Sequence, residues 1–355
     1  MSQTGTATAL RRDSFSILSI TFGLLLFTVI GLIIAELALG PVEITPGRVF
    51  AALIGNGTDG EAAIIWSIRL PRTLLGIAVG IALALSGAAL QGLLRNPLAE
   101  PGLIGVSAGA SLGAVGAIVL GAAVAEFLPD VLRTLLIPIA AFIGGAAVIA
   151  ILFTIVHLAQ SSSAITLILA GVAINAIVAA AIGVLIYVSD DQQLRDLTFW
   201  TMGSLGTADR ALIILVAVLV AVMIPVFLLQ SRALDLLQLG ERAAFHTGLD
   251  VERTRLMIAF ATALAVGAVT AAAGPVGFIG LVAPHIARLV VGSQHNLLLP
   301  VAALVGVSLV LAADLGARLA IPPQEPPIGL ATSLIGGPFF LWLLLRQISK
   351  GRLFA

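Results

Sequence analysis

The sequence has 355 residues, of which 59% are hydrophobic and only 10% are charged, and its formal net charge is zero. Soluble domains carry about 25% charged residues, so this chain has more apolar side chains than a water-soluble interior can bury. A lipid bilayer is therefore the expected solvent, and the balanced charge gives no indication of a nucleic-acid partner.

The residue inventory excludes several kinds of chemistry. The chain has no cysteine, which rules out disulfides, thiol catalysis and cysteine-bound metal centres. Its four histidines are scattered and form no HExxH pair, so we expect neither a metal site nor a catalytic residue. Lysine occurs once, at Lys350 near the C-terminus, whereas a GxxxxGK[ST] loop needs a lysine to reach the phosphates. We therefore expect no ATP site on this chain.

The apolar residues form continuous runs of about 20 residues, the length of a transmembrane helix, without the alternation of a barrel strand. The predicted fold is an all-α polytopic membrane protein: a tail at 1–14, one ten-helix transmembrane domain at 15–346 and a tail at 347–355. The ten runs are Phe15–Leu39, Arg72–Leu94, Leu103–Val124, Leu132–His157, Ala164–Val188, Ala211–Gln230, Leu256–Ala273, Gly277–Gly292, Leu297–Leu319 and Ile328–Arg346.

Two of these runs have alternative interpretations. The first follows Arg11 and Arg12, as a signal peptide would, but it is longer than the 7–15-residue apolar core of such a peptide. We therefore expect a retained helix. Only Gly274-Pro275 separates the seventh run from the eighth, so these two could instead form one bent element.

The basic residues predict the orientation, because cytoplasmic loops carry the excess of arginine and lysine. With the N-terminus inside, 11 of the 18 basic residues fall on the cytoplasmic side and seven fall outside. The sequence therefore predicts that both termini are cytoplasmic, which agrees with an even number of spans.

Two connections have a pattern of their own. Residues 189–210 are predicted to lie outside, and their spaced apolar side chains favour a short helix at the membrane interface. Residues 231–255 are predicted to lie inside, where Gly240 and Gly248 can divide them into short helices. This second connection is a solvated loop or, because plain connections are shorter, a docking platform for a soluble partner.

Polar residues and glycines within the spans suggest further roles. Asn175, mid-span in the fifth run, could line a translocation path or hydrogen-bond between helices. Asp314 is a charge within a span, and Arg318 lies one turn further on as a candidate partner. Glycines four residues apart favour close helix packing. The string at 101–106 returns in similar form at 277–281, five spans later, as in transporters built from inverted repeats.

Several strings are more specific than a generic membrane protein requires. They are Trp66–Arg72 (WSIRLPR), Gly87–Gly92 (GAALQG), Arg95–Gly102 (RNPLAEPG), Phe199–Leu205 (FWTMGSL), Leu239–Glu241 (LGE), Gly277–His285 (GFIGLVAPH), Ala313–Arg318 (ADLGAR) and Gly336–Phe340 (GGPFF). Their order and spacing resemble the permease family of ATP-binding-cassette importers for iron-siderophores, haem and vitamin B12. The resemblance covers residues 69–346, and the segment 189–205 is most similar to the haem branch.

This resemblance implies a homodimer of ten-helix subunits with the inverted-repeat fold of type II importers, surrounding one central path in the cell inner membrane. It implies two cytoplasmic ATPase subunits, which use ATP and Mg, and a periplasmic binding protein that delivers the substrate. Haem, or a related iron or cobalamin chelate, would be the cargo. The permease subunit itself would bind no cofactor stably and would catalyse no reaction.

The resemblance also assigns roles to particular residues. An ATPase-coupling segment would comprise Gly240, Glu241, Arg242, Ala243, Ala244 and Gly248. Arg69, Arg72 and Arg318 would pair with glutamates of the binding protein, because the guanidinium fork meets carboxylates bidentately. The alternatives are a helix-capping acid for Glu241, interfacial snorkelling for the arginines and, for Arg318, an internal pair with Asp314.

Two other classes of protein compete with an ATP-driven permease. A secondary carrier or channel would transport without an ATPase, but it needs working charges within spans, and only Asp314 and Glu36 qualify. An intramembrane enzyme lacks support, since the chain has no HExxH motif, no cysteine and no convincing aspartate pair.

Overall fold

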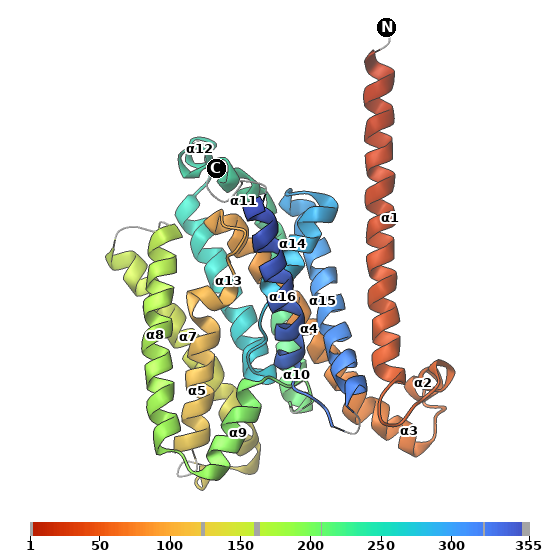
Figure 1. Ribbon diagram of the computed structural model, residues 1–355, viewed down its shortest axis with the longest axis vertical. Coiled ribbons are helices and arrows are strands. Elements are labelled where there is room, and N and C mark those ends of the chain that lie inside the picture. The colour runs from red at the N-terminus through yellow and green to blue at the C-terminus, as the bar shows by residue number, and fades with distance from the viewer. Residues whose placement is uncertain (1–2, 122–124, 160–163, 207, 322–323, 350–355) are drawn as a thin grey trace.

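The computed structural model describes residues 3–121, 125–159, 164–206, 208–321 and 324–349, and every regular element within these ranges is a helix (Figure 1). The helices are α1 (Gln3–Ala38), α2 (Pro46–Leu53), α3 (Asp59–Ile64), α4 (Leu70–Leu94), α5 (Val106–Leu120), α7 (Asp130–Leu158), α8 (Ala164–Val188), α9 (Asp191–Thr201), α10 (Arg210–Leu229), α11 (Ser231–Gln238), α12 (Glu241–His246), α13 (Val251–Ala273), α14 (Ile279–Val291), α15 (His295–Ala320) and α16 (Ile328–Ser349). A π-helical turn, Ile65–Arg69, joins α3 to α4, and a 3-10 turn, Pro101–Ile104, precedes α5.

A helix lies at each of the ten predicted runs. Within the described ranges, seven helices are long and apolar enough to cross a membrane, and three shorter apolar stretches lie in α5, in α14 and at Ile328–Trp342 of α16. The third run begins later than predicted, at Val106, because Gly105 takes a positive φ of 83° and ends the 3-10 turn before it. The seventh and eighth runs are separate helices, since α13 ends at Ala273 and α14 begins only at Ile279. The alternative of one bent element is therefore wrong.

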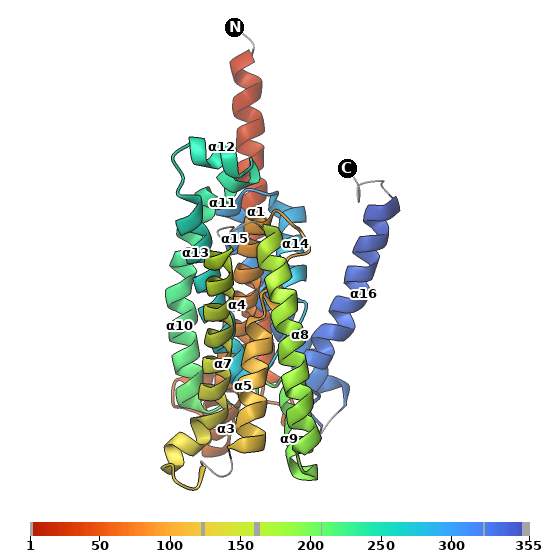
Figure 2. The ribbon, with the colours of Figure 1, turned by 90° about the vertical axis from the view of Figure 1, so that its left-hand side faces the viewer.

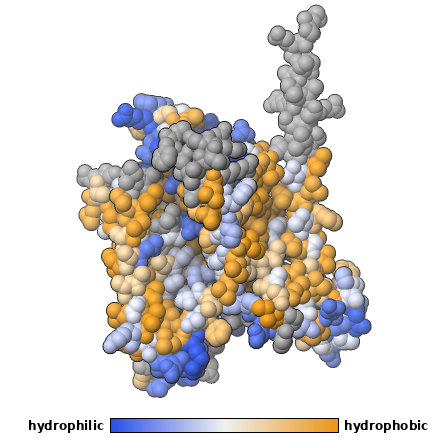
Figure 3. All heavy atoms as spheres, in the orientation of Figure 1, coloured by the Kyte–Doolittle hydropathy of each residue, from blue (hydrophilic) through white to orange (hydrophobic). Residues whose placement is uncertain are grey.

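The two ends of the bundle carry different connections. Helices α11 and α12 lie at one end of the bundle, together with the start of α1 and the end of α16, and we call it the α12 end (Figures 1 and 2). Helices α2, α3 and α9 lie at the opposite end, which we call the α9 end. Orange, hydrophobic side chains cover the flanks between these ends, and blue, hydrophilic ones gather at both of them (Figure 3). This is the surface of a protein surrounded by lipid at mid-height and by water at its two ends.

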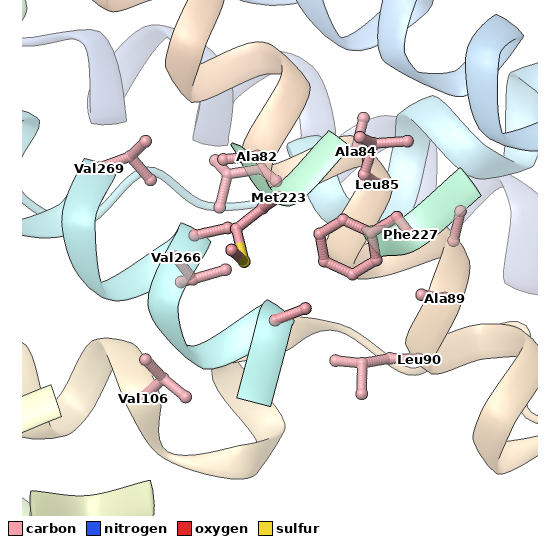
Figure 4. Close-up of a cluster of buried hydrophobic side chains, with 14 of the residues drawn as sticks. Ala82, Ala84, Leu85, Ala89, Leu90, Val106, Met223, Phe227, Val266 and Val269 are labelled. Atoms are coloured by element: carbon pink, nitrogen blue, oxygen red, sulfur yellow. The ribbon is translucent and has the colours of Figure 1, made fainter. Parts of the chain in front are cut away.

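Helix α4 lies at the centre of the bundle, surrounded by α10, α13, α14 and α15. Its side chains are small or aliphatic, and nearly all of them from Thr73 to Leu94 are buried. Figure 4 shows α4 residues meeting Met223 and Phe227 of α10 and Val266 and Val269 of α13. Because lipid tails are as apolar as this core, helix association here depends on close van der Waals contact.

Glycines provide that contact where α4 meets α15. A Cβ added to Gly80 would lie 2.6 Å from the Cα of Val307, and one added to Gly306 would clash with the carbonyl oxygen of Gly80. Helices α5 and α7 meet in the same way, since a Cβ on Gly109 would lie 2.5 Å from the carbonyl oxygen of Gly144. The predicted packing role of these glycines is confirmed.

The repeated strings have matching structures. Gly105 and Phe278 both have a positive φ, of 83° and 67°, and each stands immediately before a short helix, α5 or α14. The two helices begin close together, because a Cβ on Gly280 would lie 2.9 Å from the Cδ of Pro101. They then run in opposite directions: α5 ends near α9, where Gln193 donates to the carbonyl of Val119, and α14 ends near α11, where Gln238 donates to the carbonyl of Ser293.

We predict that Gly80→Ala destabilises the bundle. The new methyl group would overlap the backbone of α15, and overpacking of this kind costs about 1–3 kcal/mol. Thermal unfolding of the purified chain in detergent measures the effect. Gly116→Ala in α5 is the matched control, since nothing lies within 4 Å of a Cβ at that position. Equal melting temperatures for the two variants would contradict the packing role of Gly80.

Candidate functional site

The connection between α10 and α13 forms two short helices, as the sequence predicts. Gly240, with φ 105°, separates α11 from α12, and Gly248, with φ 85°, ends the turn after α12. Asp250 then caps α13 by accepting a hydrogen bond from the Arg253 amide at 2.9 Å. We call residues 231–250 the coupling segment, after the ATPase-coupling role that the resemblance implies for residues 240–248 within it, a role that stays a prediction.

The coupling segment borders an open groove of about 800 Å³ at the α12 end. Glu241, Arg242, His246 and Glu252 line it with polar groups, and Phe245 lines it with an aromatic ring. This combination of charge and apolar surface is suited to covering by another protein.

Two contacts fix the segment on the bundle. Leu234 and Leu237 of α11 and Ala244 of α12 are buried, which holds both short helices against the core. Glu241 accepts a hydrogen bond from Nη2 of Arg255 at 2.8 Å, and Arg255 is only 5% exposed. Glu241 therefore connects α12 to α13, a role that the sequence alone did not indicate. Phe245 and Leu239 are exposed on the outside of the segment.

A cluster of charged side chains lies near the α9 end. It comprises Glu36, Arg69, Arg72, Asp314, Arg318 and Glu325, and we call it the charge cluster. At its centre Arg72 of α4 donates two hydrogen bonds to Asp314 of α15, from Nε at 2.8 Å and from Nη2 at 2.9 Å. Arg72 also bonds the half-exposed Glu325.

The other two arginines have internal partners as well. Arg69 donates from Nη1 to the carbonyls of Leu37 and Ala38, at 2.7 and 2.9 Å, and so caps the end of α1. Arg318 bonds Glu36 of α1, and its Nε lies 3.4 Å from Asp314 Oδ2.

The sequence predicts that these three arginines lie toward the outer side of the membrane, and the structure shows that their side chains are buried within the bundle there. Arg69, Arg72 and Arg318 are 4%, 6% and 4% exposed. They are buried because each finds carboxylates or carbonyls on neighbouring helices, which compensates the cost of removing a charge from water. The internal pair of Arg318 with Asp314 is confirmed. Docking of a binding protein by these arginines stays a prediction, and it now requires an exchange of existing bonds.

A second cavity, of about 450 Å³, opens beside the charge cluster. Arg72 and Glu325 form one wall, and Phe199 and Trp200, from the end of α9, form another. The predicted interfacial helix at 189–210 is α9, which begins with a capping box between Asp190 and Gln193. This helix therefore borders an opening at the α9 end of the bundle.

Asn175 lies between helices. Its Nδ2 donates to the carbonyl of Gly102 at 3.1 Å, which connects α8 to the turn before α5. The interhelical hydrogen bond that the sequence offered as one alternative is present, and the lining of a path stays a prediction. His285 packs edge-to-face on Phe339, with ring centroids 6.1 Å apart. Among the described residues, no three histidine, aspartate or glutamate side chains gather as a metal ion would require.

The helices, the apolar flanks and the structured coupling segment define a polytopic membrane protein of the transporter class. The chain belongs to the FecCD transport family, whose pattern matches residues 25–346. It is a permease subunit of an ATP-binding-cassette importer.

The chain is similar to several other proteins of this class. It is 44% identical to the hemin transport system permease protein HmuU of Yersinia pestis, over 92% of this chain and 95% of that one. It is 42% identical to the vitamin B12 import system permease protein BtuC of Klebsiella pneumoniae, over 93% and 94% of the two chains. Among solved structures, an inward-facing transporter assigned to the metal-chelate ABC type matches with a TM-score of 0.79 and 29% identity, covering 92% of this chain and 99% of that one.

We predict that Glu241→Arg abolishes ATP-dependent uptake by the assembled transporter. The change replaces the partner of the buried Arg255 with a second positive charge, which drives α12 away from α13. Uptake into proteoliposomes and co-purification of the ATPase measure the effect. Glu252→Arg is the matched control. It makes the same charge change in the same groove but leaves the ion pair between Glu241 and Arg255 intact. Unchanged uptake and assembly in Glu241→Arg would rule out the coupling role.

We predict that Asp314→Ala lowers stability by about 3–5 kcal/mol, the cost of leaving buried charges without their partner. The substitution removes the two hydrogen bonds from Arg72 to Asp314 and the ion pair of Asp314 with Arg318. Chemical or thermal unfolding in detergent checks this. Asp191→Ala on α9 removes an exposed acid instead and serves as the comparison. A loss no larger than that of Asp191→Ala would show that the charge cluster contributes little.

Proposed function

We propose that this chain forms the membrane path of an importer that moves haem, or a related iron or cobalamin chelate, from the periplasm to the cytoplasm. Two copies would surround one path, and two ATPase subunits would bind their coupling segments. A binding protein would deliver the cargo at the α9 end. The homodimer, the inner-membrane location and the cytoplasmic position of both termini are parts of this proposal.

The coupling segment is the observation that carries the proposal. It is held on the bundle by buried leucines and by the Glu241–Arg255 ion pair, and it exposes Phe245 and Leu239 outward. Exposed apolar side chains such as these are unfavourable in water, so they indicate a surface that a partner protein covers. A chain that worked alone would have no use for that surface. The same end of the bundle holds the start of α1 and the end of α16, which supports placing both termini on the ATPase side (Figure 1).

The sequence supports a division of labour between chains. Lys350 is the only lysine, and no nucleotide loop surrounds it, so ATP hydrolysis and its Mg belong to the partner subunit in this proposal. The permease would contribute no catalytic residue and hold no cofactor. Its contribution would be a path that opens to one side at a time.

Haem is the cargo we favour. The support comes from the similarity to a hemin permease at 44% identity, together with the aromatic side chains of Phe199 and Trp200 that line the cavity at the α9 end. Aromatic rings of this kind can stack on a flat macrocycle. The B12 permease at 42% identity makes cobalamin the second candidate.

Reconstitution in proteoliposomes tests the proposal. The chain is combined with the ATPase and the binding protein that co-purify with it, and uptake of haem, cobalamin and a ferric siderophore is measured with and without ATP. We expect ATP-dependent uptake, greatest for haem. Uptake by the chain alone, without an ATPase, would instead establish a secondary carrier, and greater uptake of another chelate would reassign the cargo.

A further inference from the structure

Helices α4 and α15 remain in contact over most of their length. Four contacts follow one another along the pair: Gly92 with His295, Gly80 with Gly306, Gly76 with Leu311, and Arg72 with Asp314. All four keep a single antiparallel register. The 20 residues from His295 to Asp314 span about 29 Å at 1.5 Å per residue, close to the thickness of the bilayer core.

Three of the four contacts leave almost no room for sliding. A Cβ on Gly92 would overlap the imidazole of His295, and the backbones touch at Gly80 and Gly306. Arg72 and Asp314 then join the two helices by a bidentate ion pair at the α9 end. Packed interfaces of this kind shift as units, because they do not deform continuously. We therefore treat α4 and α15 as one body, the α4–α15 pair.

A polar contact attaches α11 to this pair at the α12 end. One carboxylate oxygen of Asp235, on α11, accepts a hydrogen bond from the backbone amide of His295 at 2.9 Å and lies 2.7 Å from its ring Nδ1. A carboxylate at this distance requires a proton on Nδ1, which fixes the tautomer. Gln238, one turn further along α11, donates weakly to the carbonyl of Ser293, at 3.5 Å.

Packing alone does not explain why a histidine occupies position 295. Its side chain is completely buried, and its Nε2 has no hydrogen-bond partner among the described residues. A core position filled for packing would favour an apolar side chain, because an unpaired buried nitrogen costs free energy. What the imidazole adds is the second bond to Asp235, which an aliphatic side chain cannot make.

We propose that Asp235 and His295 are positioning residues that attach the coupling segment to the α4–α15 pair, and so connect the ATPase side with the charge cluster at the α9 end. The inference rests on the proposed function, since it assumes an ATPase at α11 and α12. Glu241 and Arg255 attach α12 to α13. Besides its buried apolar residues, the coupling segment thus has two separate polar anchors, and the one through His295 leads along α15 to Asp314 and Arg318 at the opposite end.

The connection is tested in the complete transporter. With His295→Ala, we expect normal assembly and basal ATP hydrolysis, but the stimulation of hydrolysis by the loaded binding protein falls at least about fivefold, the lower end of typical coupling between two sites. Fewer molecules are imported for each ATP hydrolysed. Asp235→Ala should have the same effect, because it removes the acceptor of the same bonds.

His295→Asn is the matched control. The amide nitrogen of asparagine takes the position of Nδ1 and can still donate to Asp235, so stimulation and import per ATP should recover. If His295→Ala keeps wild-type stimulation, the proposal is wrong. It is also wrong if assembly, melting temperature and stimulation fall together and His295→Asn restores none of them, since that outcome describes a purely structural residue.

A second measurement does not depend on transport. The chain has no cysteine, so single cysteines can be introduced at the exposed positions Leu239, after α11, and Leu319, near the end of α15, and spin-labelled. We expect one narrow distance distribution in the otherwise unchanged chain and a broad one with His295→Ala. Equal widths would overturn the attachment. Failure of wild-type uptake with a narrow distribution would instead refute the proposed function alone.

Discussion

The contact between α4 and α15 constrains the rest of the bundle. Within a bilayer the hydrophobic effect does not drive helices together, so close packing and polar contacts must do so. The glycines at 76, 80 and 306 let the two backbones approach, and α10, α13 and α14 then pack around α4. A side chain at any of these glycines would separate α15 from the centre and misalign the ion pair between Arg72 and Asp314. The buried ion pair therefore depends on the glycines that bring α4 and α15 together.

The charge cluster follows from that register. Charged groups are costly in a low-dielectric interior unless each one has an oppositely charged partner with good geometry. Arg72 and Arg318 meet this condition with three acids, whereas Arg69 is held by backbone carbonyls. With three arginines and three acids, the cluster has a formal charge of zero. Asp314 and Glu36 are fully enclosed, whereas Glu325 is partly open to water at the edge of a cavity. Helices α1, α4 and α15 supply four of the six residues, and the cluster thus holds these helices together where they leave the apolar zone.

The sequence predicted the helices well because the features that specify them are local. Length and continuous hydrophobicity identify spans such as α8 and α10, and Gly240 and Gly248 mark the breaks around α12. The pair between Asp314 and Arg318 could be predicted as well, since four residues are one helical turn. The late start of α5 was missed, because its apolar run gives no sign that Gly105 adopts a left-handed conformation.

Contacts between distant parts of the chain could not be predicted in this way. Arg72 and Asp314 are 242 residues apart, and nothing in either neighbourhood specifies the other. The sequence therefore indicated glutamates of a binding protein as partners of Arg72, and gave no sign of its pair with Asp314. Asp235 and His295 were not singled out for the same reason: an acid on an amphipathic helix and a histidine at a helix start are each ordinary. A single sequence specifies their pairing only through the complete fold.

The two short helices α5 and α14 place breaks in the backbone inside the bundle. Helices α5 and α14 begin beside each other, each after a residue with positive φ, and run toward opposite ends. Each is too short to cross the apolar zone alone, at about 20 Å for 13 residues. The irregular backbone before them is protected by α4, since Gly87 lies against the carbonyl of Gly280. Unsatisfied backbone groups are excluded from lipid, so these breaks can exist only where a continuous helix covers them. The uninterrupted α4 and α15 therefore supply the frame, and the broken elements around them supply the places at which the chain can change direction.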